Sequence, residues 1–577
     1  MTSIRLLTFA FSTAFCLLGT NLFKMQVIDY PKFLQASERN RVRPVILEAP
    51  RGQIVDRHGQ ELAASRISFD AYIVPPAKKE EEAVLSAYGK SLGISHEEIT
   101  RRFNKNKGGR YTPVLIAEDL EKDDAIRIEE ETADLPGVFI KTRPIRTYPL
   151  GPAAAHVIGY IGAIGPEEFD RRKVFEYLKT DWVGRNGLES SYEGYLRGEH
   201  GVSQFESDSR GRLLKVLSIR ERVQGRTLAT TLDRDLQLLA YEALGDRTGA
   251  VAVMDLKDGG LWAMASTPSY DPNWFVAPSV NASQIRHSLS DRKKPLLNRA
   301  ISDAYPPGST FKIISAAAAL RANKVDSGTR YFCPGVYVIS GFSFRCWKAE
   351  GHGSQSLIEA LEHSCNVFFY NLGIKIGVEA LAKESRRAGL GRPTGIDLPY
   401  EVAGLVPDPE WKRKTRREKW YTGETANLVI GQGSLTTTPL QMLRATAVTA
   451  TKGKVFEPYL VHKIDDVDIS PKHPSSVRLS DSQWRVIHQG MERVVGSVSG
   501  TGQRAKHKDV QIAGKTGTAQ APKNAEDHAW FVGYAPADNP KAAIVVFVEH
   551  GGKGGAAGAG IAGQMFAHMQ ENGYFDE

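Results

Sequence analysis

The sequence predicts an α/β (α+β) protein with one large globular domain, a smaller mixed region before it and one membrane-spanning helix. Three observations lead to this prediction. Leu6–Phe23 is a run of 18 residues without a charge. Short strand patterns alternate with charged amphipathic helices over residues 66–225. From residue 227 onward, strand patterns stand at both ends of the chain with helical sequence between them, so the two ends are expected to complete one sheet.

The composition is that of a globular protein and limits its partners. The 577 residues are 41% hydrophobic and 24% charged, and a chain of this length ordinarily forms more than one domain. The net charge of +8 fits a solvated basic surface, or attraction to an acidic polymer or anionic lipid. No ladder of aromatic and basic residues, zinc-finger spacing or Walker loop is present, so nucleic acid is not an expected partner.

The uncharged run at the N-terminus predicts an uncleaved anchor. Arg5 precedes it and Lys24 follows it. Its length is near the roughly 20 residues of a spanning helix and exceeds the ~7–15 residues of a signal-peptide core. No small-residue cleavage site of the A-x-A kind follows, and Phe15 before Cys16 argues against lipoprotein processing. We therefore expect a single span with nearly all of the chain on one side.

The region between the anchor and residue 226 is predicted to be a stand-off or docking module. Residues 25–45 read as a short helix that leads into an extended segment, and Ala49–Ser65 has a hairpin pattern around Arg57–Gly59. Gly184–Gly201 is rich in turn-forming residues. The region shows no nucleophile or metal constellation.

The large domain is predicted to begin near Thr227 with a strand and an amphipathic helix. Gly249–Ser266 has the pattern of a hairpin. The sequences AWFVGYAP and KAAIVVFVEH predict two further strands near the C-terminus, and a final helix is expected from about Gly560.

Three short motifs carry the chemistry in this domain. Ser309 and Lys312 stand three residues apart after Pro306–Pro307–Gly308, at the predicted first turn of a helix, so their side chains share a face. A helix N-terminus favours an oxyanion, and a desolvated lysine can activate a serine hydroxyl. Ser364 and Asn366 lie between two helical stretches, where they can project into a cleft.

The third motif lies on a strand-like run near the C-terminus. Lys515–Thr516–Gly517–Thr518 contains a glycine that would let another backbone approach closely. Each motif alone is common by chance. A Ser-x-x-Lys, a Ser-x-Asn and a Lys-Thr-Gly motif in this order are the signature of penicillin-recognising serine enzymes.

The chain resembles the class B penicillin-binding proteins, most closely their cell-elongation member, penicillin-binding protein 2. The resemblance covers the anchor, RGQIVDRHGQELA, GRNGLESSYEGYLRG, the three motifs, LVIGQGSLTTTPLQM and DHAWFVGYAP. It implies a peptidoglycan D,D-transpeptidase domain with a central antiparallel sheet flanked by helices, on an elongated α+β pedestal. The implied division is an anchor at 1–24, a pedestal of the dimerisation type at 25–226 and a transpeptidase domain at 227–577.

The resemblance also implies residue roles. Ser309 would attack the D-Ala–D-Ala carbonyl of a stem peptide, Lys312 would take the serine proton, and Ser364 would relay protons to the leaving amine. The substrate-binding residues would be Asn366, Lys515, Thr516, Gly517 and Thr518, and the backbone N–H groups of Ser309 and Thr518 would form the oxyanion hole. Adjacent Lys515 and Thr516 should face opposite sides of a regular strand, which leaves the threonine roles the less secure.

The same resemblance implies place and partners. The substrate lies outside the cytoplasm, so the chain is expected in the cell inner membrane with its bulk in the periplasm. Expected ligands are stem peptides and β-lactams, and the pedestal would contact a membrane glycosyltransferase of the elongation machinery. A division-specific transpeptidase, a D,D-carboxypeptidase, a β-lactamase or β-lactam sensor, and a non-enzymatic scaffold are the alternatives. A secreted β-lactamase would need neither anchor nor pedestal, and intact motifs argue against a scaffold.

Three of the four cysteines cluster near the second motif. Cys333, Cys346, His352 and Cys365 are separated by 13, 6 and 13 residues. The pattern alone leaves open buried thiols, one disulfide with a spare thiol, and a closed four-ligand zinc site. The resemblance implies one structural Zn²⁺, because penicillin-binding protein 2 is similar in carrying zinc at matching positions, with carboxylates in place of some thiols in certain members.

Overall fold

A computed structural model describes residues 2–34, 42–108, 112–207, 213–277, 281–469, 471–521 and 525–576. The chain divides into two compact units, each assembled from three segments. Unit 1 comprises Met1–Arg51, Ser65–Ile145 and Arg197–Gly225. Unit 2 comprises Gly52–Ala64, Arg146–Leu196 and Arg226–Glu577. Two segments from within the predicted region 25–226 therefore belong to the unit that holds the motifs.

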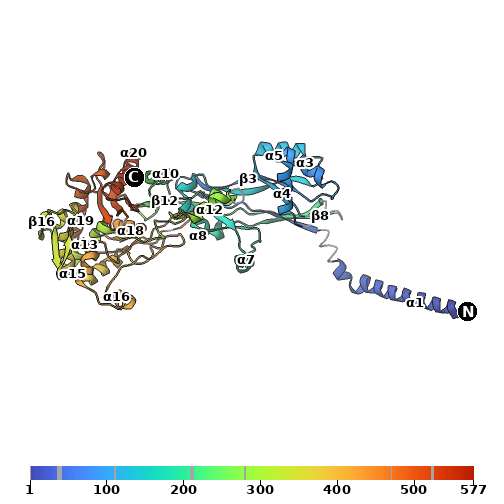
Figure 1. The fold of residues 1–577 in the computed structure, drawn as a ribbon, viewed down its shortest axis with the longest axis horizontal. Helices are drawn as coiled ribbons and strands as arrows, with labels where there is room; N and C mark the ends of the chain where they lie inside the picture. The colour runs from blue at the N-terminus through green and yellow to red at the C-terminus, as the bar shows by residue number, and fades with distance from the viewer. Residues whose placement is uncertain are drawn as a thin grey trace. The chain divides into compact units, whose positions relative to one another are not determined.

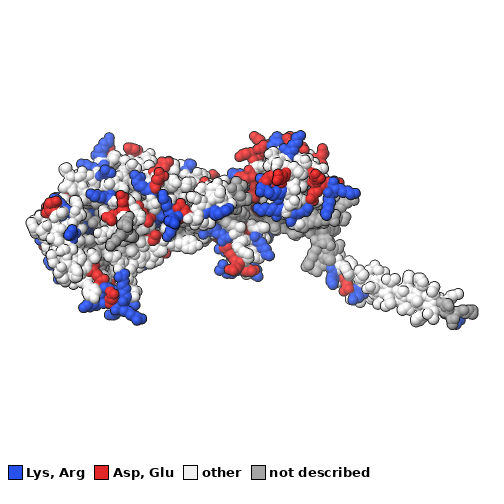
Figure 2. Space-filling model, viewed as in Figure 1, with Lys and Arg blue, Asp and Glu red and all other residues white. Residues whose placement is uncertain are grey.

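Unit 1 begins with the predicted apolar helix. Helix α1 (Thr2–Phe23) continues into a short π-helix, η1 (Lys24–Ile28). Among the described residues, one helical stretch, Ile4–Ile28, is long and apolar enough to cross a membrane, with a mean hydropathy of 1.6. Figure 2 shows α1 without acidic or basic side chains along most of its length. Residues 35–41 of the predicted segment 25–45 lie outside the described part.

The rest of unit 1 contains a small sheet and a helical lobe. The sheet is antiparallel, with the order β1 (Val42–Leu47), β8 (Gly201–Ser207), β9 (Leu213–Arg220). In the lobe, three helices pack on the strands that follow Ser65 (Figure 1). These elements are β3 (Glu61–Ile73), α3 (Glu81–Ser91), α4 (His96–Asn106), β4 (Val114–Leu120), α5 (Lys122–Glu131) and β5 (Val138–Thr147). The part of the lobe between β3 and β5, residues 75–136, begins and ends at neighbouring positions, since Val74 N–H donates to Gly137 O at 2.8 Å.

Unit 2 starts with the predicted hairpin. Strand β2 (Ile54–Val55) pairs with the start of β3 and, in parallel, with β10 (Leu228–Thr230). Strand β10 also pairs with β18 (Val461–Ile464), which pairs with β19 (Val467–Asp468). Residues 151–196 form short elements: η2 (Gly151–Ala153), α6 (Ala155–Ile158), β6 (Ile161–Ala163), α7 (Pro166–Arg172), η3 (Lys173–Phe175), β7 (Trp182–Gly184), α8 (Gly187–Ser191) and α9 (Glu193–Leu196). The last two of these lie in the turn-rich segment Gly184–Gly201.

The central sheet of unit 2 is antiparallel and joins the two ends of the predicted large domain. Its order is β12 (Leu261–Thr267), β11 (Gly249–Asp255), β23 (Ala542–Val548), β22 (His528–Ala535), β21 (Ala513–Ala519). Nearly every residue of β11, β12, β22 and β23 is buried, which explains their continuous apolar sequence. The prediction of one sheet completed by both ends is confirmed.

Helices cover both faces of this sheet. Helix α10 (Arg234–Leu244) and α20 (Ala557–Glu571) lie side by side although they come from opposite ends of the domain (Figure 1). Asp233 caps α10 by accepting from two backbone N–H groups. Helix α18 (Pro439–Ala450) packs against β11, β22 and β23. Helix α20 is the predicted final helix, and it begins at Ala557, slightly before the predicted start at Gly560.

The remaining helices and hairpins of unit 2 lie outside the central sheet. Helix α13 (Lys312–Arg321) packs on α15 (Asn366–Arg387), and α14 (Leu357–Glu362) packs on α19 (Asp481–Gly496). Two hairpin-like sheets pair β13 (Arg330–Cys333) with β16 (Gly353–Ser356) and β14 (Val336–Ile339) with β15 (Phe342–Arg345). Further elements are α11 (Asn273–Val276), α12 (Ala282–Ser290), η4 (Gly308–Phe311), α16 (Pro409–Arg416), α17 (Thr422–Val429), β17 (Lys454–Val455), β20 (Ser475–Ser476) and η5 (Gln503–Ala505).

Candidate active site

Ser309 lies in a 3₁₀ turn, where the sequence predicted the first turn of an α-helix. The turn is η4, and Lys312 is the first residue of α13 that follows it. In a 3₁₀ turn, residues three apart lie directly above one another, so this turn still places Ser309 and Lys312 on one side. Ser309 is partly exposed, whereas the side chain of Lys312 is fully buried.

The Lys312 amine joins the first two motifs. Its Nζ donates to Asn366 Oδ1 at 2.7 Å, to Ser364 O at 2.8 Å and to Ser364 Oγ at 3.2 Å. Burial lowers the pKa of Lys312 to about 8, because desolvation disfavours the ammonium. An appreciable fraction of this amine is therefore neutral near physiological pH and can accept a proton.

Ser364 reaches the amine from an unusual backbone conformation. It connects α14 to α15 with φ of 54°, in the left-handed region that residues other than glycine seldom adopt. The next residue, Cys365, is the N-cap of α15, and its Sγ accepts from Phe368 N–H at 3.5 Å. The cap and the bond from Lys312 to Ser364 O together fix the turn.

Strand β21 forms the facing wall with the third motif. Thr516 and Thr518 both line the cavity described below, as the two-residue period of a strand requires. Thr516 Oγ1 lies 2.7 Å from Thr501 Oγ1. Lys515 is fully buried and its Nζ donates to Thr516 O at 2.9 Å. Burial and the nearby charge of Lys312 lower the pKa of Lys515.

Two glycines allow the nucleophile turn to touch this strand. A Cβ on Gly517 would lie 2.9 Å from Pro307 O, and a Cβ on Gly308 would lie 2.6 Å from Thr518 O. Both distances are shorter than real side chains tolerate. The two backbones are therefore in contact, which brings Ser309 and Thr518 side by side.

These residues share one cavity of about 710 Å³. Members of all three motifs line it, together with residues from five other segments: Ser309, Arg345, Cys346, Trp347, Ser364, Asn366, Ile430, Gln432, Thr501, Thr516, Thr518, Gln520, Glu526, Asp527, Gly552, Lys553 and Gly555. A volume in the range of ligand-binding clefts and a candidate nucleophile make this the candidate active site.

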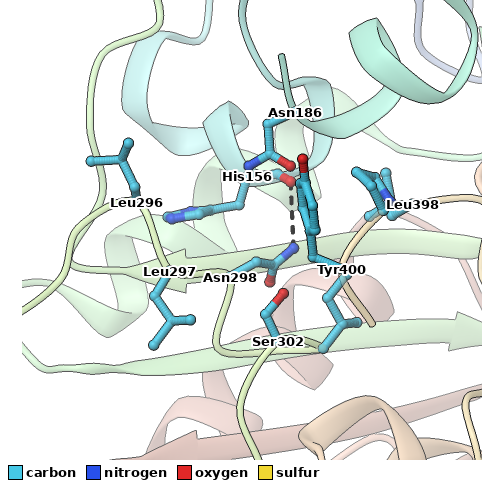
Figure 3. Close-up of a pocket in the computed structure, with 10 residues that line it drawn as sticks. His156, Asn186, Leu296, Leu297, Asn298, Ser302, Leu398 and Tyr400 are labelled. Carbon is cyan, nitrogen blue, oxygen red and sulfur yellow. Dashed lines mark hydrogen bonds between the residues drawn. The ribbon is translucent and has the colours of Figure 1, made fainter. Parts of the chain in front are cut away.

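A second cavity in unit 2 lacks these properties. It measures about 270 Å³ and is lined by His156, Asn298, Tyr400 and seven other uncharged residues (Figure 3). Two of its polar side chains already bond to backbone, since His156 Nε2 pairs with Pro295 O at 2.8 Å and Asn298 Nδ2 donates to His156 O at 3.4 Å. Burial lowers the pKa of His156 to about 4, so this cavity is neutral.

The four predicted metal ligands converge. Their ligand atoms, from Cys333, Cys346, His352 and Cys365, all lie within 4.8 Å of one another. His352 Nδ1 faces two of the sulfurs, at 3.6 Å from Cys333 and 3.5 Å from Cys346. The three thiols are buried, and the hydrogen bond from Cys365 lowers the pKa of the Cys346 thiol. This set of donors could hold a metal ion.

Comparison with known proteins gives two matches that together span most of the chain. The penicillin binding protein transpeptidase domain matches residues 249–570, and the penicillin-binding protein dimerisation domain matches residues 46–230. The chain belongs to the class B penicillin-binding proteins. Both regions and the N-terminal apolar helix agree with the predicted fold class.

Individual relatives of this penicillin-binding protein are similar along nearly their whole length. The peptidoglycan D,D-transpeptidase MrdA of Haemophilus influenzae is 33% identical over 572 residues, 94% of this chain and 88% of the relative. A solved complex of penicillin-binding protein 2 with MreC from Helicobacter pylori matches with a TM-score of 0.82 at 28% identity, over 92% of this chain and 99% of that one. A solved peptidoglycan synthase complex, described as coordinating polymerization and crosslinking, matches with a TM-score of 0.77 at 30% identity. The match covers 98% of this chain and 97% of that one.

Some cavity residues of this penicillin-binding protein were not predicted individually. Gln432 and Asp527 lie in sequences that carried the family resemblance, which was the available signal for them. Thr501 lies 15 residues before its partner Thr516 and in no recognised motif. Arg345 and Trp347 flank the predicted ligand Cys346, and that spacing gave no indication that they line the substrate cavity.

Proposed function

We propose that this penicillin-binding protein crosslinks peptidoglycan stem peptides during cell elongation through an acyl-enzyme on Ser309. The chain is a serine-type peptidoglycan D,D-transpeptidase of the elongation machinery. The observation that supports the residue assignment is the Lys312 amine, which bonds to Ser364 and Asn366 in the cavity that Ser309 lines.

Acylation begins with a proton transfer. Neutral Lys312 takes the Ser309 proton while Oγ attacks the carbonyl between the two terminal D-alanines. The C–O bond forms, the C–N bond breaks and D-alanine leaves with a proton returned to its amine. Ser364 Oγ, at 3.2 Å from Lys312 Nζ, is placed to relay that proton.

The facing strand stabilises charge during this step. The backbone N–H groups of Ser309 and Thr518 form the oxyanion hole, where one donor is typically worth ~3–4 kcal/mol of barrier. Thr516 and Thr518, which line the cavity, contact the terminal carboxylate of the peptide, and Lys515 supplies positive potential from its buried position behind them. An amine from a second stem peptide then attacks the ester carbonyl. The C–N bond of the crosslink forms, the C–O bond to Ser309 breaks, and Lys312 passes the proton of the amine to Ser309 Oγ.

The lowered pKa of Lys312 predicts a rising pH profile. Only the neutral amine accepts the serine proton, so the second-order rate constant for benzylpenicillin acylation should increase about tenfold per pH unit below pH 8 and level off above it. Stopped-flow acylation between pH 6 and 9 measures this. A rate constant that is independent of pH over that range would contradict the role of Lys312 as base.

The cysteine cluster fits one structural Zn²⁺. A tetrahedral zinc with Zn–S bonds of ~2.3 Å and a Zn–N bond of ~2.1 Å separates sulfur from nitrogen by about 3.6 Å. The Sγ to Nδ1 distances of 3.6 and 3.5 Å support this donor set. Four protein ligands leave no position for water, so the metal would supply only structural support, holding Cys365 and thereby the Ser364 turn.

Metal content tests this site directly. The purified full-length chain should contain about one zinc by elemental analysis, and Cys346→Ser should lower the zinc content and slow acylation. Cys16→Ser is the matched control and should keep its zinc, because Cys16 is exposed on α1 and is not one of the four clustered residues. Normal acylation by metal-free protein, or a mapped disulfide among the three buried cysteines, would refute the proposal.

The location follows from the anchor and the substrate. Helix α1 is proposed to span the cell inner membrane once and to leave the remaining chain in the periplasm, where stem peptides and β-lactams are met. The relatives that share the two-domain sequence were solved with MreC and in a peptidoglycan synthase complex. Unit 1 is proposed to contact a membrane glycosyltransferase of the elongation machinery.

A deletion within the unit 1 lobe tests whether this lobe contacts the glycosyltransferase. Since Val74 N–H bonds to Gly137 O, residues 75–136 can be replaced by two glycines without opening a gap. We expect this variant to acylate with benzylpenicillin at the wild-type rate and to lose co-purification with the glycosyltransferase. Full co-purification and normal cell elongation with the deletion would show that the lobe is not the docking element.

A further inference from the structure

Arg345 and Trp347 stand on either side of Cys346 and both line the active-site cavity. Arg345 is the last residue of β15. Its carbonyl oxygen accepts from Tyr370 O–H at 3.2 Å and from Asn366 Nδ2 at 3.5 Å. Both donors lie on α15, so the Arg345 backbone is fixed beside the substrate-orienting Asn366.

The Arg345 guanidinium is available for a ligand. The side chain is exposed, and among the described residues it forms no ion pair. The acidic residues of the cavity, Glu526 and Asp527, come from the segment before β22. A planar guanidinium on the wall of a substrate cavity is suited to bind a carboxylate through two parallel N–H···O bonds.

Asn366 indicates which part of the peptide Arg345 meets. Its Oδ1 accepts from Lys312 Nζ at 2.7 Å and one N–H of Nδ2 donates to Arg345 O, which leaves the second N–H of Nδ2 to donate to the substrate. In the proposed reaction, the acceptor there is the amide carbonyl that precedes the scissile D-alanyl pair. The terminal carboxylate lies on the other side, with Thr516 and Thr518. Arg345 is therefore on the acyl side of the bond that breaks.

Trp347 supports the same part of the cavity. Its indole N–H donates to His363 O at 3.0 Å, and its ring lies 5.3 Å from that of His352. The side chain nevertheless remains 61% exposed. A fixed aromatic surface next to an unpaired cation matches a side chain with an aliphatic stem and a terminal carboxylate.

We propose that Arg345 determines donor specificity by binding a carboxylate on the side chain of the residue that precedes D-Ala–D-Ala. This inference rests on the proposed function, because the acyl side is defined by Ser309 and Asn366. It concerns the choice of donor peptide.

Two penicillins that differ by one carboxylate provide the test. Carbenicillin is benzylpenicillin with a carboxylate on the acyl side chain, the part that corresponds to the residue before the D-alanyl pair. Arg345→Gln should slow acylation of the full-length protein by carbenicillin about fivefold more than by benzylpenicillin, the effect of an exposed ion pair of ~1 kcal/mol. The same ratio is expected for D-alanine release from acetyl-L-Glu-D-Ala-D-Ala relative to its L-Gln analogue.

Lys553→Gln is the matched control. Lys553 is an exposed cation that lines the same cavity from the loop after β23, so its loss should affect the two penicillins equally. Equal losses for both members of both pairs in Arg345→Gln, or the same ratio in Lys553→Gln, would overturn the proposal. Mapping the wild-type benzylpenicillin adduct to Ser309 tests the proposed function separately, so a failed ratio counts against Arg345 alone.

Discussion

Ser309→Ala should abolish covalent labelling by benzylpenicillin, with a loss of at least about 10⁴-fold in the acylation rate constant. The substitution removes the attacking oxygen and little else, because Ser309 is partly exposed in its 3₁₀ turn. Intact-mass spectrometry of the full-length protein after incubation with the drug measures the adduct. The same variant should form neither crosslinked nor hydrolysed products from stem peptides.

A second serine on the surface serves as the control for this variant. Ser343 is exposed on β15 and takes no part in the proposed chemistry, so Ser343→Ala should label at the wild-type rate. Both variants should unfold within a few degrees of the wild type. Labelling of Ser309→Ala at an appreciable rate would mean that another residue is the nucleophile.

Lys312→Met should reduce the acylation rate constant by about 10²–10⁴-fold, the typical contribution of a positioned base. Methionine fills a similar volume in this fully buried position but cannot accept a proton. The variant also loses three hydrogen bonds that join Ser364 and Asn366, so part of the loss reflects their positions. The rate constant is measured with benzylpenicillin under single-turnover conditions.

Lys312→Arg separates charge from base function. An arginine keeps the positive charge but is not deprotonated at accessible pH, so this variant should be as slow as Lys312→Met. Its residual rate should lack the rise toward pH 8 expected of the wild type. Near-normal acylation by Lys312→Arg would show that the lysine acts through its charge alone.

The central sheet was predictable because local sequence determines its strands. Strands β11 and β23 are buried on both faces and read as unbroken apolar runs, which a sequence reveals directly. The chain passes back and forth between the two units, so that each contains three separate segments, and this alternation was not predictable from local sequence. Strand β2 has only two residues, and its pairing with β10 joins segments separated by more than 170 residues. No local pattern specifies such a contact.

The active site was predictable in its residue types and less so in its geometry. The spacing of Ser309 and Lys312 indicated a shared face, but a 3₁₀ turn replaces the expected α-helical turn. The left-handed backbone of Ser364 has no signal in the sequence, because it is imposed by the cap at Cys365 and the bond from Lys312. Arg345 is held beside the cavity by hydrogen bonds from α15, which begins 21 residues later in the chain. Sequence spacing alone therefore could not predict that Arg345 lines the cavity.

The Ser364 backbone also limits how far the enzyme can be stabilised without loss of activity. A non-glycine residue held at φ of 54° costs of the order of 1–3 kcal/mol, a sizeable part of the ~5–15 kcal/mol that keeps a domain folded. Glycine would relieve that cost but would delete the hydroxyl that meets Lys312. Selection for thermal robustness and selection for turnover therefore oppose each other at this position. An enzyme engineered for heat tolerance should obtain its gains elsewhere in the chain and keep Ser364 unchanged.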